Sequence, residues 1–340
     1  MIEVLILSPQ LLQSRAIARF LKKTSQYIII GGILPEENKY SNKSIYTTCI
    51  RVSPETLAKY KLVIPTGTRS TKWLASIFPE ITIGSISYPS KNLEIFSKII
   101  QIDIARSLNI PIPKEYKEIN KIKNFPVFYK EKIEQGGKER GIVRNSSELK
   151  QFRKYNSIFF QEYITSPHTH AVCFMAKNGE IISSFTHKEI ISCPRTGGSA
   201  VIIKSVTNDE ILCYTKKLLN ELCYSGWGMA EYKYCPKRDK YVFMEINAKF
   251  WSSIEFSFVN QPEFLKLLFN IEIPIQPCKS AVFPELLFQL SIKDIFLFYK
   301  YIYKYKPLCD NTIFNTAMLA TISKVKHKVF LYSSRFINNI

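Results

Sequence analysis

The segment 241–251, with the sequence YVFMEINAKFW, constrains this chain more than any other part of it. It predicts a short apolar strand in which Glu245 and Asn247 point the same way, because side chains two residues apart on a strand share a face. A second apolar stretch at 227–233 carries Glu231, and the polar residues between the two stretches predict a hairpin. The hairpin would bring two carboxylates and an amide oxygen together, a ligand set suited to Mg²⁺. A lone Glu in a strand is usually a solvated side chain, so this interpretation depends on the other motifs.

The composition is that of a folded chain of two or three modest domains. The chain has 340 residues, of which 46% are hydrophobic and 22% are charged, as in ordinary globular proteins. The formal net charge of +19 suggests an anionic partner: a nucleotide, a phosphorylated substrate, nucleic acid or acidic lipid. The abundance of Lys, Ile, Asn and Tyr offers a plainer explanation, because an AT-rich genome would produce the same bias.

The cysteine pattern and the N-terminal residues favour a cytoplasmic protein. The eight cysteines include no Cys-x-x-Cys pair and no zinc-like spacing, which favours reduced thiols. The first residues have neither the basic leader nor the cleavage site of a signal peptide. No apolar run reaches the roughly 18 residues of a membrane span. We therefore expect a reducing compartment.

Residues 1–95 alternate short apolar runs with helical patterns. Strands are expected at 4–7, 27–30 and 61–64, and a helix is expected at 11–21. This order predicts an α/β domain with a parallel sheet. The stretch lacks Gly-x-Gly-x-x-Gly, so a dinucleotide site is not indicated.

A strand and a glycine-rich loop come next. A helix is expected from Lys98 to Asn109, and a strand is expected at 125–130, ending in Lys130. In the loop that follows, Gly136 and Gly137 would let backbone N–H groups approach an anion closely. Surface hairpins often have the same appearance, so the loop alone is a weak signal.

Further elements are expected in the second half of the chain. Residues 157–164 read as a strand, and Asn178-Gly179 reads as the turn of a hairpin. The helix expected at 208–222 would pack on the hairpin that carries the carboxylates. Lys188 and Arg195 stand before a Gly-Gly-Ser stretch that could hold an anion or could equally be a surface turn.

The order of these motifs resembles the ATP-grasp superfamily, and within it the carboxylate–amine ligases and the carbamoyl-phosphate-synthase-like members. The resemblance covers roughly residues 98–260. Ala248 and Lys249 stand where the family usually has Pro and Arg. The resemblance implies a Rossmann-like domain at 1–95 and a two-subdomain ATP-grasp module at 96–270, with a glycine-loop subdomain at about 125–160. The basic, aromatic residues 271–340 would form an extension that is mostly helical.

The resemblance also implies roles for individual residues at the nucleotide. Two Mg²⁺ ions, for which Mn²⁺ could substitute, would bridge the ATP phosphates and would be held by Glu231, Glu245 and Asn247. The phosphates would contact Lys98, Lys130 and the loop glycines Gly136 and Gly137. The side chain of Gln161 and the backbone of Ile164 would read the adenine edge. The family's usual ribose-binding Glu is missing, which leaves His168 or Thr169 for that contact.

On the acceptor side, the resemblance implies catalytic roles for Lys249, Lys188 and Arg195. Lys249 would neutralise the transferred phosphate in place of Arg, as a point charge rather than a bidentate fork. The implied reaction activates a carboxylate as an acylphosphate and joins it to an amine, with release of ADP. The alternatives are a small-molecule kinase of the same fold and a non-catalytic protein that binds anions or membrane surfaces.

The aromatic and basic segment 294–335 leaves a choice of partners open. It could lie on an anionic membrane surface, or it could form a helical cap over the core. The carboxylate set argues against a protein that only binds nucleic acid. The acid, the amine and the oligomeric state are not indicated.

Overall fold

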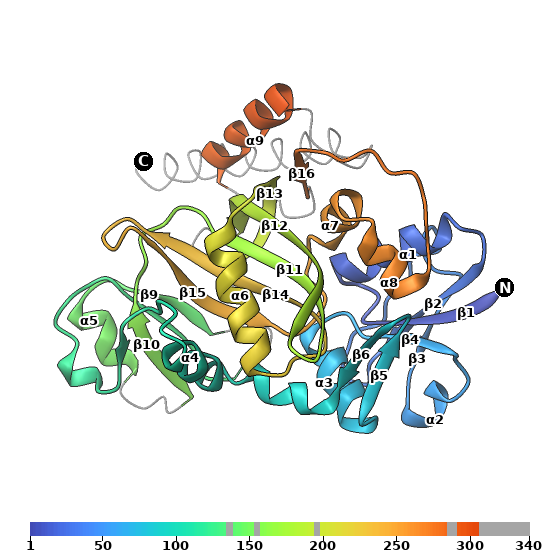
Figure 1. Ribbon diagram of the computed structural model, residues 1–340, viewed down its shortest axis with the longest axis horizontal. Helices are drawn as coiled ribbons and strands as arrows, with labels where there is room; N and C mark the ends of the chain where they lie inside the picture. Colours follow the sequence, from blue (N-terminus) through green and yellow to red (C-terminus); the bar gives the residue numbers. More distant parts are fainter. Residues whose placement is uncertain (134–138, 153–156, 194–197, 284–290, 306–340) are drawn as a thin grey trace, which may run out of the picture.

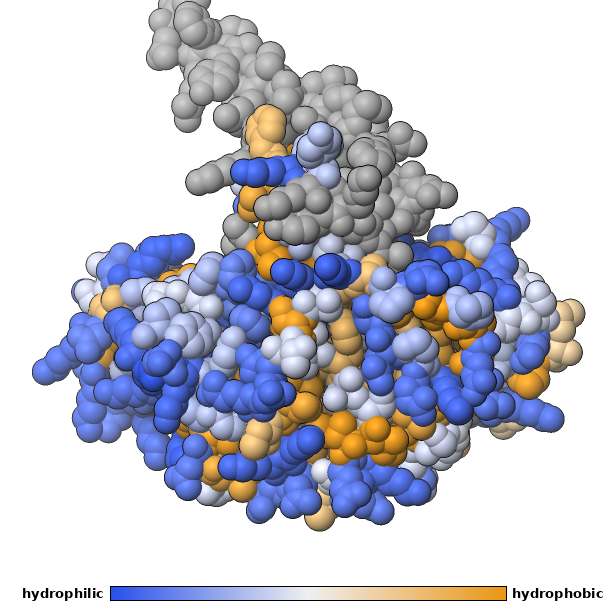
Figure 2. Space-filling view, turned by 45° about the horizontal axis from the view of Figure 1, so that its top comes forward, coloured by the Kyte–Doolittle hydropathy of each residue, from blue (hydrophilic) through white to orange (hydrophobic). Residues whose placement is uncertain are grey.

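The computed structural model describes residues 1–133, 139–152, 157–193, 198–283 and 291–305. An N-terminal domain and a small four-stranded sheet lie at opposite ends, with a six-stranded sheet between them (Figure 1). Figure 2 shows hydrophobic residues gathered in a central band between two largely hydrophilic regions of one face. In the described part of the chain, no helix is long and apolar enough to cross a membrane.

The N-terminal domain contains the parallel sheet that the sequence predicts. Its strand order is β3-β2-β1-β4, with β1 at Ile2–Leu7, β2 at Tyr27–Ile33, β3 at Thr48–Arg51 and β4 at Leu62–Ile64. Strand β1 is buried at Val4 to Leu7 because it has a parallel partner on each side. The connecting elements are α1 (Leu12–Lys22), α2 (Pro54–Leu57), α3 (Thr68–Ile77) and the hairpin of β5 (Glu80–Ile83) and β6 (Ile86–Pro89).

Helix α4 (Lys98–Ser107) leads from the N-terminal domain to the small lobe. The sheet of this lobe has the order β7-β10-β8-β9, with β7 at Glu115–Tyr116, β8 at Val127–Glu131, β9 at Arg140–Val143 and β10 at Ile158–Glu162. Because β7 belongs to it, the small sheet begins earlier than residue 125. The short elements here are α5 (Ser146–Leu149) and 3₁₀ turns at Ser90–Phe96, Ile119–Lys121 and Lys150–Phe152.

The six-stranded sheet is antiparallel and has the order β15-β14-β11-β12-β13-β16. Its strands are β11 (His170–Lys177), β12 (Glu180–Cys193), β13 (Ser199–Ser205), β14 (Gly226–Cys235), β15 (Lys240–Asn247) and β16 (Ser280–Val282). The turn between β11 and β12 is the predicted one, since Asn178 and Gly179 both adopt positive φ, at 49° and 88°.

Helix α6 (Asp209–Glu221) begins at Asn208, whose side chain accepts a hydrogen bond from the backbone N–H of Ile211. Its predicted packing partner needs a correction. The helix lies mainly against β11 and β12, and it reaches β14 through the hydroxyls of Thr215 and Tyr232, 2.9 Å apart. Helix α4 packs against β15, the other strand of the carboxylate hairpin.

The C-terminal part differs in one respect from the predicted helical extension. Residues 280–282 form strand β16, which extends the six-stranded sheet. Helix α9 (Ile292–Tyr305) then packs its residues Ile295, Phe298 and Tyr301 onto the apolar surface of β12, β13 and β16. Residues 306–340, with most of the predicted membrane-contact segment, lie outside the described residues.

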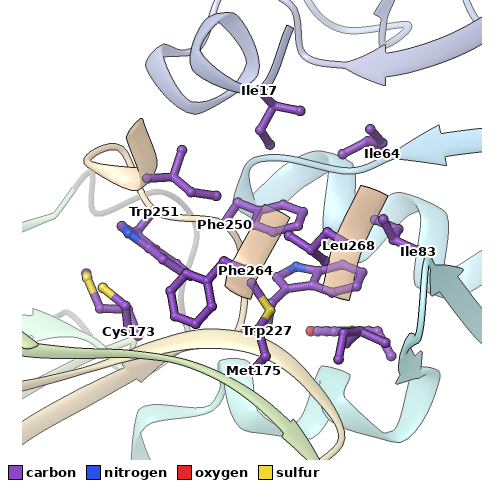
Figure 3. Packing of buried hydrophobic residues seen from close by; sticks show 14 of the residues in the cluster. Ile17, Ile64, Ile83, Cys173, Met175, Trp227, Phe250, Trp251, Phe264 and Leu268 are labelled. Atoms are coloured by element: carbon purple, nitrogen blue, oxygen red, sulfur yellow. The ribbon is translucent and has the colours of Figure 1, made fainter. Parts of the chain in front are cut away.

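Helices α7 (Ile254–Asn260) and α8 (Glu263–Phe269) join the N-terminal domain to the central sheet. Arg19 on α1 forms an ion pair with Glu255 on α7 at 2.6 Å, and the rings of Phe20 and Phe258 meet edge to face. Figure 3 shows the aromatic core at this junction, where Trp227 and other aromatic side chains gather among residues from both parts. One continuous core therefore fixes the N-terminal domain against the ATP-grasp-like sheet.

Candidate active site

The predicted hairpin forms and brings its oxygen-bearing side chains together. Glu231 on β14 lies opposite Glu245 on β15, and Met229 lies opposite Asn247. The side-chain amide nitrogen of Asn247 is 3.1 Å from Oε1 of Glu231 and 3.4 Å from Oε1 of Glu245. The amide thus bridges the two carboxylates and reduces their repulsion.

The backbone of β15 at this point is held from α4 and from the aromatic core. The side chain of Gln101 binds both the N–H and the carbonyl oxygen of Ile246, at 2.7 and 2.8 Å. The hydroxyl of Tyr88 donates to the carbonyl oxygen of Ala248 at 2.7 Å. The ring of Phe250 stacks on Trp227 with centroids 4.7 Å apart (Figure 3). These contacts fix the chain directly after Glu245, which explains why the polar motif is followed by two buried aromatic residues.

Two buried lysines meet the hairpin on the side of the small lobe. Nζ of Lys98 lies 2.8 Å from Oε2 of Glu245, and Nζ of Lys130 lies 4.0 Å from the same oxygen. Lys130 also donates to the carbonyl oxygen of Met244 at 3.0 Å. Since Lys98 and Lys130 are 6% and 4% exposed, their charges act in a medium of low dielectric constant.

The pKa values of the two hairpin carboxylates are shifted in opposite directions by their surroundings. Burial alone would raise the pKa of Glu245, but Lys98, Lys130 and Lys249 together hold that pKa well below its usual range. Burial raises the pKa of Glu231, and repulsion from Glu245 adds to this effect. A divalent cation between the two carboxylates would relieve both the burial cost and the repulsion, so this donor set fits a hard metal ion. In the part of the chain that is described, no three His, Cys, Asp or Glu side chains cluster as a metal site. The proposed set uses two carboxylates and one amide.

The nucleotide side contains an amide that lacks partners. Gln161 on β10 is 1% exposed, and among the described residues neither its oxygen nor its nitrogen has a hydrogen-bond partner. Leaving such a group unsatisfied costs about 1–3 kcal/mol. Ile164 lies close by in an apolar cluster with Cys235, Val242 and Met244. An amide that can both donate and accept fits the hydrogen-bonding edge of an adenine ring.

A cavity of about 830 Å³ opens between the six-stranded sheet and the N-terminal domain. Glu231, Glu245 and Asn247 form part of its sheet wall. The opposite wall includes the N-terminal end of α3, and Nζ of Lys249 donates to the hydroxyl of Thr68 there, at 2.6 Å. The three candidate metal ligands and Lys249 therefore face one space.

The other residues predicted for the acceptor side or the ribose are placed as follows. Glu189 on β12 lines the cavity, whereas its neighbour Lys188 lies on the opposite face, near His170. The structure therefore does not bring Lys188 to the cavity. The Nδ1 atom of His168 lies 3.0 Å from the carbonyl oxygen of Glu189, and Thr169 lines the cavity. Arg195, Gly136 and Gly137 lie outside the described residues.

Three residues that matter here did not stand out in the sequence: Gln101, Arg140 and Glu189. Gln101 resembles any polar residue of a helix. Arg140 lies on β9, directly after the glycine-rich loop, and reaches the cavity wall. Glu189 shares a strand face with His187, but only the pairing of β11 with β12 and β14 shows that this face carries Glu231.

Comparison with known proteins agrees with this geometry. Residues 93–255 match the family model of the carbamoyl-phosphate synthase L chain, ATP binding domain. No curated protein sequence matches the chain significantly. Among solved structures, the L-amino acid ligase from Bacillus licheniformis is similar at 13% identity and a TM-score of 0.59, over 83% of this chain and 79% of that one.

Two carboxylases share the fold. The biotin carboxylase domain of the 2-oxoglutarate carboxylase from Hydrogenobacter thermophilus, solved with MgADP, ADP and bicarbonate, gives a TM-score of 0.59 at 14% identity, over 81% of this chain and 71% of that one. Pyruvate carboxylase from Rhizobium etli gives 0.57 at 11% identity, over 75% of this chain. The present chain spans only 27% of the length of that pyruvate carboxylase.

The fold and the carboxylate hairpin define an ATP-grasp module behind a parallel-sheet N-terminal domain. Residues 93–255 thus form an ATP-binding domain of the carbamoyl-phosphate synthase L chain type, and the solved structures share the fold of the chain.

Proposed function

We propose that this protein is an ATP-dependent ligase that activates a carboxylate as an acylphosphate and joins it to an amine. One observation carries the proposal. The hairpin side chains Glu231, Glu245 and Asn247 lie between two buried lysines on one side and a cavity shared with the N-terminal domain on the other. Such an arrangement can hold the terminal phosphate of ATP within reach of a second substrate.

The nucleotide would lie between the small sheet and the six-stranded sheet. Gln161 and Ile164 would bind the adenine, and His168 or Thr169 would contact the ribose. The triphosphate would then meet Lys98 and Lys130. Two Mg²⁺ ions, or Mn²⁺ in their place, would be held by Glu231, Glu245 and Asn247. When bound, these ions supply positive charge that stabilises the transferring phosphoryl group.

The acceptor chemistry would take place in the cavity. A carboxylate oxygen of the acid attacks the γ-phosphorus, and the bond from phosphorus to ADP breaks. The amine nitrogen then attacks the acyl carbon, and phosphate leaves with the electron pair of the C–O bond. One proton of the nitrogen goes to the departing phosphate. Lys249 on the cavity wall would stabilise the charge of the phosphate.

The size and position of the cavity are compatible with an acid and an amine that bind there together. At about 830 Å³, it lies toward the upper end of the roughly 300–1,000 Å³ range of small-molecule sites. The adenine-side residues Gln161 and Ile164 are not among its described lining residues. The cavity therefore offers room for an acid and an amine in addition to the nucleotide.

The test is a screen of acids and amines for release of ADP in the presence of Mg²⁺ and ATP. Amino acids and sugar acids serve as the panel, and hydroxylamine is added to trap any acylphosphate as a hydroxamate. We expect ADP release that depends on an acid, and a hydroxamate of that acid. A stable phosphorylated product without a hydroxamate would instead identify a kinase. No ADP release with any acceptor, together with anion binding that weakens steeply with salt, would identify a non-catalytic binding protein.

A further inference from the structure

We infer that Glu189 binds the positively charged ammonium group of the amine substrate inside the cavity. This inference rests on the proposed ligase function and deepens it, because it assigns the amine a place and a required charge. The occupant is an amine that is protonated in solution, as the amino group of an amino acid is. Glu189 would hold it beside the phosphate-transfer site. The bound ammonium would lose one proton to water before its nitrogen attacks the acyl carbon, and a second proton would go to the departing phosphate as described above.

The pairing of the strands places Glu189 on the same sheet face as the hairpin carboxylates. Glu231 lies opposite Ala171 on β11, and Ala171 lies opposite His187 on β12. Glu189 is two residues beyond His187, so it shares that face, and its backbone N–H donates to the carbonyl oxygen of Thr169 at 2.8 Å. Glu189 and Glu231 consequently line the same cavity.

Glu189 is a buried carboxylate that has no adjoining cation in the described part of the chain. It is 6% exposed, and Oε2 accepts a hydrogen bond from the hydroxyl of Ser192 at 2.6 Å. Within the described ranges, no Lys or Arg nitrogen lies within 4.0 Å of it. Burial raises the pKa of Glu189 to about 7, although Ser192 and the more distant Lys233 and Arg140 act in the opposite direction. A buried carboxylate gains most from a ligand that brings its own positive charge.

The other charges of the site have different partners. Lys98 and Lys130 lie at Glu245. Nζ of Lys233 points to the carbonyl oxygen of Ser166 at 3.4 Å. In the proposed reaction, ATP and the acid are both anions that these lysines and Arg140 can attract. Of the substrates, only the amine is a cation. Among the other described carboxylates of the cavity wall, Glu36 is exposed and Glu37 is only partly buried, so the buried Glu189 is the carboxylate that gains most from receiving it.

Glu189 also stands apart from the proposed metal ligands. Strand β11 separates β12 from β14, and Glu189 lies two residues beyond the position opposite Glu231, so the backbones at these two residues are about 12 Å apart at the usual strand spacing. As described above, the carboxylates of the site do not form a three-residue metal cluster. An ion held by Glu231 and Glu245 would not need Glu189.

The experiment compares Glu189→Gln with the wild type, using a charged and an uncharged nucleophile. Hydroxylamine is largely uncharged at neutral pH, whereas the amino acids of the panel carry an ammonium group. With the acid found in the screen, we expect E189Q to raise KM for the amino acid acceptor by about tenfold or more. Its rate of hydroxamate formation and its KM for ATP should stay within about twofold of the wild type.

Two further variants provide the controls. Glu180→Gln changes an exposed carboxylate on the same strand and should leave every parameter unchanged. Ser192→Ala keeps the Glu189 carboxylate but removes its hydrogen bond, and we expect a smaller rise in the same KM. An unchanged KM for the amino acid in E189Q would overturn the inference, and so would an equal loss of hydroxamate formation, which would place Glu189 at the nucleotide or metal. A wild type that forms no hydroxamate with any acid would instead refute the ligase function itself.

Discussion

The nucleotide side and the acceptor side of this site are built in different ways. On the nucleotide side, Lys98, Lys130 and Gln161 come from α4 and the small sheet, and each lies in a short stretch with a readable pattern. On the acceptor side, the wall combines the start of α3, the end of β15 and a face of β12. The difference teaches that the nucleotide side is recognisable from short stretches of sequence, whereas the acceptor side exists only through tertiary contacts.

The largest effect on activity is expected at Glu245, which lies between the nucleotide side and the acceptor side. Glu245→Gln removes a proposed metal ligand while keeping the shape of the side chain. We expect ADP release to fall by roughly a hundredfold to a thousandfold, because charge on the transferring phosphate would lose its stabilisation. A coupled ADP assay gives the rate, and circular dichroism checks the fold. Turnover that survives in this variant, with E180Q as its matched control, would remove the hairpin from the mechanism.

On the acceptor side, Lys249 is expected to act through its charge. Lys249→Ala should lower kcat by about tenfold or more, since the phosphate would lose a cation, whereas Lys249→Arg should retain most activity. Thr68→Val removes only the hydroxyl that Lys249 contacts and should have a smaller effect. The kcat and KM of all three variants are measured with the same acid and amine. Equal rates for the Ala and Arg variants would mean that Lys249 acts only by packing.

On the nucleotide side, substitution of Gln161 is expected to stabilise the protein without nucleotide but to weaken ATP binding. Gln161→Leu removes a buried amide that has no hydrogen-bond partner among the described residues, so the protein without nucleotide should become more stable, by about 1 kcal/mol. The same change should raise KM for ATP severalfold, because the adenine edge would lose its partner. Thermal melting with and without MgATP separates the effect on stability from the effect on ATP binding. A variant that binds ATP normally would place the adenine elsewhere.

The smallest effect on activity is expected for a histidine of the β12 face, whose substitution changes the pH dependence of stability. Burial, with a further contribution from His170, lowers the pKa of His187 to about 3. The unfolded chain therefore takes up a proton near pH 6.5 while the folded chain does not, so stability is complete above pH 6.5 and is lost as the pH falls toward 3. The slope reaches at most about 1.4 kcal/mol per pH unit. His187→Asn should flatten this part of the pH dependence of urea unfolding. An unchanged slope would show that the histidine is protonated in the folded protein.

Much of the module could be predicted from the sequence because its motifs keep their order. Apolar alternation around Glu231 and Glu245 was sufficient to predict the hairpin, and its register confirms the facing carboxylates. The position of Lys188 shows where prediction from the sequence fails. Lys188 and Glu189 are neighbours in the sequence, and Lys188 was the one predicted for the acceptor side. A shift of one residue on a strand exchanges the two faces, and only the pairing of β12 with β11 selects Glu189.

The sequence by itself determined the parallel N-terminal sheet and the carboxylate hairpin, because these depend on local periodicity and on residue types at short spacing. The lysines that approach the hairpin were implied by the family resemblance rather than by local periodicity. Only the tertiary structure decided that Gln101 holds the backbone at Ile246, that Lys249 meets Thr68 and that Glu189 faces the cavity. Each of these contacts joins elements far apart in the chain. Their formation depends on how a shared hydrophobic core packs the elements together, and no local pattern records that packing.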